Sequence, residues 1–136
     1  MKRIGSALAL ALRGALLGAL LGTFSGCGGG IVIGLGNGFD NTPPSVSVAL
    51  PAGPVRAGDT LHVSAAAADN DGIDTVAFYR VDSGRAVLLG SVGSEPYGWD
   101  LTVPADGRTT LSVFARATDW TGNRADSATA SVDVAP

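Results

Sequence analysis

The chain has 136 residues, of which 46% are apolar, 15% are charged and one is Cys, so it has room for one domain and cannot be a multidomain enzyme. After residue 26, six Arg stand against twelve acidic residues, and this net charge of −6 argues against a nucleic-acid partner, because phosphate binding needs clustered Lys or Arg. The single Cys excludes an intrachain disulfide and any Cys-rich metal site.

Residues 1–26 have the pattern of an export signal. Lys2 and Arg3 give a positive start, and residues 14–24 form an uninterrupted apolar stretch. This stretch of 11 residues suits a signal peptide and is too short for the roughly 20 residues that cross a bilayer. We therefore predict a signal peptide and no transmembrane helix.

Cys27 follows two small residues at the end of the apolar stretch. The segment 21–27, Leu-Gly-Thr-Phe-Ser-Gly-Cys, resembles the end of a bacterial lipoprotein signal, in which the Cys is lipidated and becomes the new N-terminus. Phe24 stands where such signals usually have Leu, and an ordinary signal peptide that contains a thiol is the alternative. The resemblance implies that a lipid on Cys27 anchors the protein in the cell envelope. Because Gly28 and not Asp follows, it further implies the outer membrane.

Residues 27–42 are predicted to be the lipidated Cys and a Gly-rich tether. Six Gly lie between residues 28 and 38, a density that disfavours packed structure. A phosphate-binding loop at residues 34–38 would require a helix directly after it, and Asp-Asn-Thr-Pro-Pro follows instead. Pro43 and Pro44 cannot donate to a strand ladder, so the predicted domain spans residues 43–136.

From Ser45 onward, apolar residues alternate with polar or small ones, and no stretch of the domain keeps a helical period. We expect seven strands, at residues 45–50, 61–69, 73–81, 86–92, 97–103, 111–119 and 128–134. Seven short strands separated by turn signals are typical of an all-β, immunoglobulin-like antiparallel sandwich.

The pattern Leu-x-Val-x-Ala-x-Ala-x-Asp occurs twice, at residues 61–69 and 111–119. In an immunoglobulin topology these two strands lie in opposite sheets at the centre of the domain. We expect their small Ala residues where antibody domains have a disulfide, with Trp99, Phe78 and Val76 supplying bulk nearby.

Several motifs together resemble the bacterial Ig-like domains of surface and secreted proteins. They are NTPPSVSV at 41–48, ADNDGI at 68–73, VAFY at 76–79, VLLG at 87–90, PY at 96–97, Trp99 and ATDWTGN at 117–123. The resemblance covers residues 42–135 and implies one Ig-like sandwich. Such modules act as spacers, adhesin segments and accessory domains, so it implies a structural or protein-interaction role without identifying the partner.

No catalytic set is recognisable in the sequence. His62, the only His, lies on the outward parity of its strand, and no Ser is placed to pair with it. A pair of carboxylates for glycoside hydrolysis would need a cleft that this pattern does not offer. We predict no enzymatic activity and no obligatory cofactor.

Acidic residues gather at one predicted end of the sandwich. Since strands 61–69 and 111–119 run the same way, their following loops emerge together, and the start of the domain with Asp40 and Asn41 should lie there too. The residues that these two loops contribute are Asp69, Asp71, Asp119 and Asn123. Inward-facing carboxylates need partners. Each Asp either accepts N–H groups of its own turn, or the four residues bind Ca²⁺, which prefers oxygen ligands gathered from several loops.

Trp120 is predicted at a loop tip, where a large apolar side chain is unusual and indicates a candidate contact surface. It packs either on Pro43, Pro44 or the tether, or on a glycan or a partner protein. Besides a non-enzymatic structural or interaction role, the sequence thus leaves open a carbohydrate- or calcium-binding adhesion module acting through Asp69, Asp71, Asp119 and Trp120. Edge-to-edge packing with another envelope protein is a third interpretation.

Overall fold

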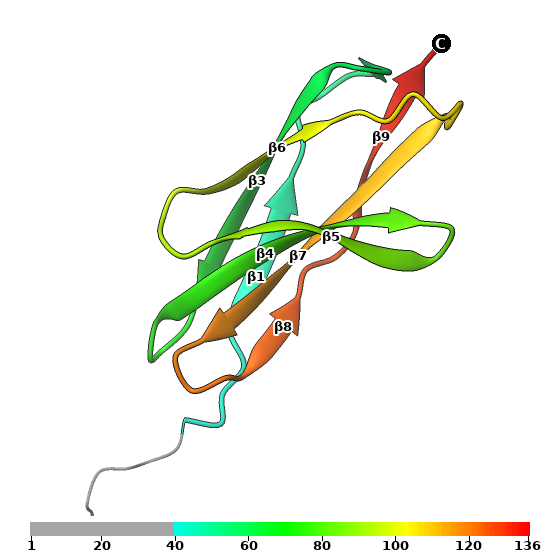
Figure 1. The fold of residues 1–136 in the computed structure, drawn as a ribbon. Coiled ribbons are helices and arrows are strands. Elements are labelled where there is room, and N and C mark those ends of the chain that lie inside the picture. Colours follow the sequence, from blue (N-terminus) through cyan, green and yellow to red (C-terminus); the bar gives the residue numbers. More distant parts are fainter. Residues whose placement is uncertain (1–39) are drawn as a thin grey trace, which may run out of the picture. The chain divides into compact units, whose positions relative to one another are not determined.

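The computed structural model describes residues 40–136, and the predicted signal peptide, Cys27 and most of the tether lie outside these residues. All regular elements of the described part are strands (Figure 1). They are β1 (Ser45–Ala49), β2 (Val55–Arg56), β3 (Thr60–Ala68), β4 (Ile73–Asp82), β5 (Arg85–Val92), β6 (Tyr97–Thr102), β7 (Thr110–Asp119), β8 (Arg124–Asp126) and β9 (Ala130–Ala135). No helix within residues 40–136 is long and apolar enough to cross a membrane.

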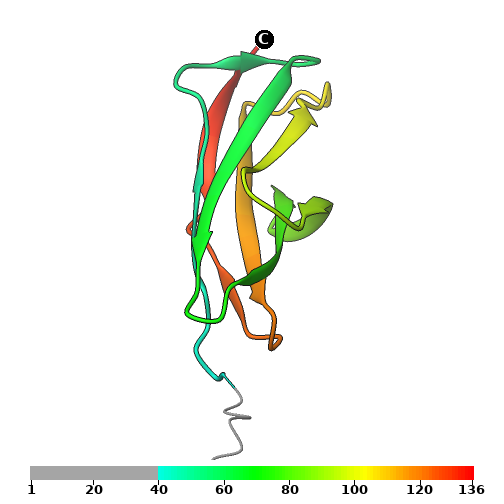
Figure 2. The ribbon, with the colours of Figure 1, turned by 90° about the vertical axis from the view of Figure 1, so that its left-hand side faces the viewer.

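The strands form two sheets that face each other across the core (Figures 1 and 2). The smaller sheet has the order β1-β3-β6, and the larger has the order β2-β9-β7-β4-β5, with β8 paired to β7. The predicted all-β, Ig-like sandwich is thus confirmed, and each of the seven expected strands is present. The sequence interpretation missed β2 and β8, which have two and three residues.

The core is made by the inward-facing residues of both sheets. β7 shows the alternation most clearly, because every second residue from Leu111 to Asp119 is buried. The largest fully buried side chains are Phe78, Leu61, Leu111, Val63, Val76, Val103, Val113 and Asp119. As expected from the repeated pattern, β3 and β7 lie in opposite sheets; Ala115 and Ala117 are fully buried, and Ala65 and Ala67 pack against the core.

Trp99 of β6 reaches from the smaller sheet to β5 of the larger one. A Cβ atom on Gly90 would lie only 2.1 Å from Cη2 of the indole, so the ring lies directly against the Gly90 backbone. Trp99 therefore fills the space between β5 and β6, the two strands that stand at one side of the sandwich. Only a residue without a side chain permits this approach.

A network of charges lies where β4 ends and β7 begins. Arg80 Nε donates to Asp82, and Arg108 donates to both Asp82 and Asp106. The hydrogen bonds from Arg108 hold the pKa of Asp106 at about 2, below the ordinary value of 3.8. The network links the β4–β5 hairpin to the loop before β7 at the end of these strands away from Asp119.

Candidate functional site

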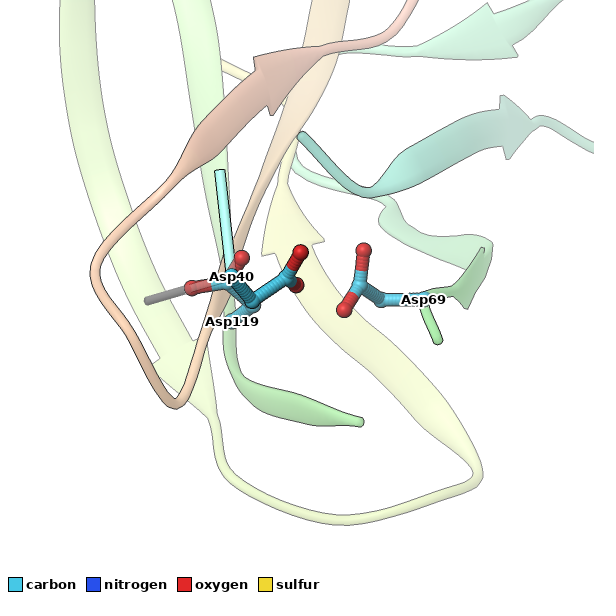
Figure 3. A group of neighbouring side chains, drawn as sticks. All are labelled: Asp40, Asp69 and Asp119. Carbon is cyan, nitrogen blue, oxygen red and sulfur yellow. The ribbon is translucent and has the colours of Figure 1, made fainter. Parts of the chain in front are cut away.

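Three carboxylates meet at the other end of the sandwich (Figure 3). Asp40, Asp69 and Asp119 each contribute an oxygen to a group whose members all lie within 4.8 Å of one another. Asp119 is the last residue of β7, Asp69 directly follows β3, and Asp40 precedes β1. The shared direction of β3 and β7 thus brings the two loops together with the start of the domain, as the sequence predicted. We call these three residues the Asp cluster.

Asp119 is held by its own turn. Its side chain is almost fully buried, with 2% of the residue exposed. Oδ1 accepts the backbone N–H groups of Thr121 and Asn123, both at 2.8 Å, and Oδ2 accepts the Asn123 side-chain amide at 2.8 Å. Burial would raise the pKa of Asp119, but the hydrogen bonds from Asn123 and Thr121 outweigh it and hold the pKa below 3.8. Asp119 is therefore ionised at neutral pH.

Asn123 connects this turn to the segment before β1. Besides Asp119, its Nδ2 donates to the backbone oxygen of Asp40 at 2.9 Å. The Asp40 carboxylate in turn accepts the backbone N–H of Thr42 at 3.0 Å, a bond that lowers the pKa of Asp40. The position of Asp40 is thus set by local hydrogen bonds on both its backbone and its side chain.

Two oxygens of the Asp cluster are buried without a partner. Asp69 Oδ2 accepts the N–H of Asp71 at 2.9 Å, but Asp69 Oδ1 accepts none, and the same holds for Asp40 Oδ2. None of the ion pairs found within residues 40–136 involves the cluster. Buried carboxylate oxygens without donors cost free energy, and three carboxylates at this spacing repel one another. A cation would remove both penalties.

The Asp cluster differs in part from the metal-ligand set that the sequence suggested. Asp69 and Asp119 are brought together. The carboxylate of Asp71 does not belong to the Asp cluster, and only the backbone N–H of Asp71 contacts it, by donating to Asp69 Oδ2. Asn123 directs its amide nitrogen at Asp119. Asp40 was expected at this end but not named as a ligand; its place just before the two Pro residues that begin the domain was the available signal. Asp119 does accept N–H groups of its own turn, as the first of the two alternatives for these Asp residues describes.

Trp120 lies beside the Asp cluster at the tip of the β7–β8 turn, and 66% of it is exposed. A Cβ atom on Gly72 would lie 3.2 Å from the indole Nε1, so the ring lies against the β3–β4 loop. Gly72 has a φ of +89°, a backbone conformation that favours Gly. The sequence interpretation had not considered this neighbour. The two loops that carry Asp69 and Asp119 are thus also joined through Trp120.

Residues 44–113 match the family described as bacterial Ig domain. The chain belongs to this family. Among solved structures, it is similar to the fibronectin(III)-like modules of Clostridium thermocellum CbhA, with 27% identity and a TM-score of 0.55 over 66% of this chain and 94% of that one. The PKD domain of an M14-like peptidase from a Thermoplasmatales archaeon has 22% identity and a TM-score of 0.49 over 71% of this chain and all of that one. No curated protein matches the chain.

His62 of this Ig domain lies on the outer face of the smaller sheet. Its Nδ1 is 2.7 Å from Asp100 Oδ1, and the side chains of the two residues are 60% and 69% exposed. No hydroxyl group of residues 40–136 is hydrogen-bonded to this pair. An exposed pair of this kind contributes little to stability. It lacks the nucleophile that a hydrolytic triad requires.

Proposed function

We propose that the chain is a non-enzymatic lipoprotein of the bacterial cell envelope, in which one Ig domain has a structural or protein-interaction role. The observation that carries the proposal is Cys27, the only Cys, placed directly after a signal-like apolar stretch and 13 residues before Asp40. The fold supports it, because Ig-like domains serve many binding and spacing roles. The exposed His62–Asp100 pair, without a nucleophile, supports the non-enzymatic part.

The anchor and the tether would keep the domain close to the outer membrane. Each buried methylene of an acyl chain contributes about 0.8 kcal/mol, and stable anchoring needs more than one chain, which a bacterial lipoprotein Cys carries. A Gly-rich tether of this length spans roughly 20 Å on average. The domain would thus remain within reach of other envelope components while it changes orientation.

Replacement of Cys27 by Ser tests the anchor. We expect the Cys27→Ser protein to be soluble or unprocessed, whereas the wild type and a Thr42→Ser control stay in the membrane fraction after a high-salt wash. The melting temperature of the domain should be the same in all three, since the core is built from residues 46–134. Equal membrane retention of Cys27→Ser and wild type would refute the proposal.

A second function, calcium binding in an adhesion module, is favoured by the two unpartnered oxygens of Asp40 and Asp69. Ca²⁺ takes six to eight oxygens, about 2.3–2.6 Å away, and carboxylates are its strongest ligands in proteins. We propose that the Asp cluster is the core of such a site, with Asn123 holding Asp119 in place. A bound ion would neutralise the mutual repulsion and tie the start of the domain to both loops.

Thermal unfolding of residues 28–136 in calcium, magnesium and a chelator tests this site. A ligand at 100 times its Kd stabilises the fold by about 2.7 kcal/mol. For a domain of this size, each kcal/mol raises the melting temperature by about 4–8 °C. We expect a calcium-specific rise in wild type and in Asp71→Asn, and no rise in Asp69→Asn. Superimposable wild-type curves in calcium and chelator would contradict the calcium site.

The glycan-binding form of this adhesion role depends on Trp120, whose exposed indole offers a stacking surface. Trp120→Ala should abolish binding to glycan or cell-wall arrays and leave the melting temperature unchanged within about 2 °C. Arrays that bind neither protein, or both equally, would exclude Trp120 as a sugar contact.

A further inference from the structure

The outer edge of β5 has no partner strand. β5 pairs with β4 alone, and no other strand of residues 40–136 covers its free backbone groups. Two of the three exposed large apolar side chains lie on it, Val87 with 38% and Leu88 with 59% of the residue exposed. Natural sheets protect such edges with charged residues, Pro or β-bulges, and residues 86–92 contain no charged residue and no Pro. One bulge interrupts the edge at Leu89, which has no partner residue on β4. In Figures 1 and 2 the β4–β5 hairpin projects from the side of the sandwich.

A row of apolar side chains leads to this edge on the outer face of the larger sheet. Leu88 pairs with Tyr79 of β4, and Tyr79 pairs with Phe114 of β7. The Tyr79 and Phe114 rings are stacked, with centroids 4.9 Å apart and an interplanar angle of 6°. Their neighbours Phe78, Val113 and Ala115 are buried in the core, so Tyr79 and Phe114 are on the face turned away from the smaller sheet. Leu88 is the last residue of this row, because β5 is the edge strand of the larger sheet.

We propose that β5 pairs antiparallel with β5 of a second copy of this chain, with Leu88 opposite the partner's Leu88. Residues directly opposite in an antiparallel pair share a face, so the row Phe114, Tyr79, Leu88 would continue into the same row of the other copy. Because the bulge at Leu89 shifts the count by one, this register places Arg85, the one charged residue of β5, opposite Val92 and not opposite a second Arg. The edge is therefore complementary to itself in apolar surface and in charge.

Self-pairing fits this edge better than capture of a foreign strand, because the matching row of side chains is supplied by the same chain. Two short strands and one row of side chains bury less than the roughly 1,200 Å² of a standard interface, so the soluble domains should associate weakly. Tethering to one membrane would raise the local concentration toward about millimolar. That gain rests on the proposed lipid anchor, whereas the pairing itself does not.

Disulfide trapping tests the register. The chain of residues 28–136 contains no Cys, so Leu88→Cys introduces a single thiol. Opposite residues in an antiparallel pair have Cα atoms about 4.5–5.5 Å apart, within the range that a disulfide spans. Ala86→Cys would place its thiol about four residues, roughly 13 Å, from the partner's thiol. Ser47→Cys is the matched control on β1, an edge strand of the other sheet.

We expect rapid, high-yield covalent dimers from Leu88→Cys alone. Equal trapping of Leu88→Cys and Ser47→Cys would overturn the proposal, and faster trapping of Ala86→Cys would overturn the register. Sedimentation equilibrium of the Cys-free chain up to about 1 mM gives the affinity, and Leu88→Lys should weaken association at least tenfold while Ser47→Lys does not. A wild type that stays monomeric throughout, or a Leu88→Lys protein that dimerises equally well, would refute the β5 pairing. Neither result bears on membrane retention, which depends on Cys27.

Discussion

Gly90 of the larger sheet lies directly against Trp99 of the smaller sheet, and Gly90→Ala tests this contact. An ideal Cβ on residue 90 would lie 2.1 Å from Cη2, 2.4 Å from Cζ2 and 2.5 Å from Cζ3 of Trp99. Nonbonded carbon atoms prefer separations of about 3.5–4.0 Å, so the indole must be displaced from its place or β5 must shift outward. Since Gly90 does not have a positive φ, the cost is steric and not due to the backbone conformation.

Overpacking of this kind typically costs about 1–3 kcal/mol. The reduced freedom of the unfolded chain on Gly→Ala replacement returns about 0.4–1 kcal/mol. The net loss is then centred on about 1.3 kcal/mol, which corresponds to a melting temperature lower by roughly 5–10 °C for a domain of this size. Differential scanning calorimetry of residues 28–136 resolves a shift of this magnitude.

Gly93→Ala is the matched control, because its Cβ would meet the Asp74 backbone oxygen at an ordinary 3.6 Å. It should leave the melting temperature unchanged or slightly raised. The steric account also predicts that Gly90→Ala costs much less when Trp99 is already Phe, since a smaller ring leaves room for the methyl group. Equal melting temperatures for Gly90→Ala and Gly93→Ala would refute the reasoning.

Three further predictions follow from the core and the charges. Phe78→Ala removes a fully buried ring and should lower the free energy of unfolding by about 3–5 kcal/mol in urea titration, whereas the half-buried Tyr79→Ala should cost less. Asp119→Ala leaves the donors of Thr121 and Asn123 without their acceptor, so its urea midpoint should fall below that of Asp71→Ala, and equal midpoints would contradict the role assigned to Asp119. Asp106 has a pKa of about 2 in the folded state and 3.8 in the unfolded state. The ionised Asp106 therefore stabilises the fold above about pH 4, and this stabilisation is lost as the pH falls toward 2. In the Asp106→Asn protein, the melting temperature should decline less between pH 4 and pH 2 than in the wild type.

The strands were predictable because their signal is local. Alternation over five or more residues marked all seven long strands, and the repeated pattern at 61–69 and 111–119 placed β3 and β7 in opposite sheets. β2 and β8 escaped prediction because two or three residues cannot establish an alternating pattern. The three residues of β8 also follow directly on the turn after Asp119, so the sequence pattern did not distinguish them from turn residues.

The Asp cluster was predictable only in outline. Strand direction alone implied that the loops after β3 and β7 share one end of the sandwich. Which carboxylates converge depends on side-chain directions in irregular segments, so the sequence could not indicate that Asp40 lies with Asp69 and Asp119 while Asp71 does not. The contacts of Gly90 with Trp99 and of Gly72 with Trp120 likewise depend on how neighbouring segments meet in space, and no local pattern encodes them.

Mass spectrometry of the protein extracted from bacterial membranes tests the central claim most directly. If the chain is a lipid-anchored Ig domain, the first residue of the mature protein is Cys27, and its N-terminal peptide carries the mass of the attached acyl chains. A mature protein that begins at another residue, or an N-terminal peptide with an unmodified Cys27, would contradict the account.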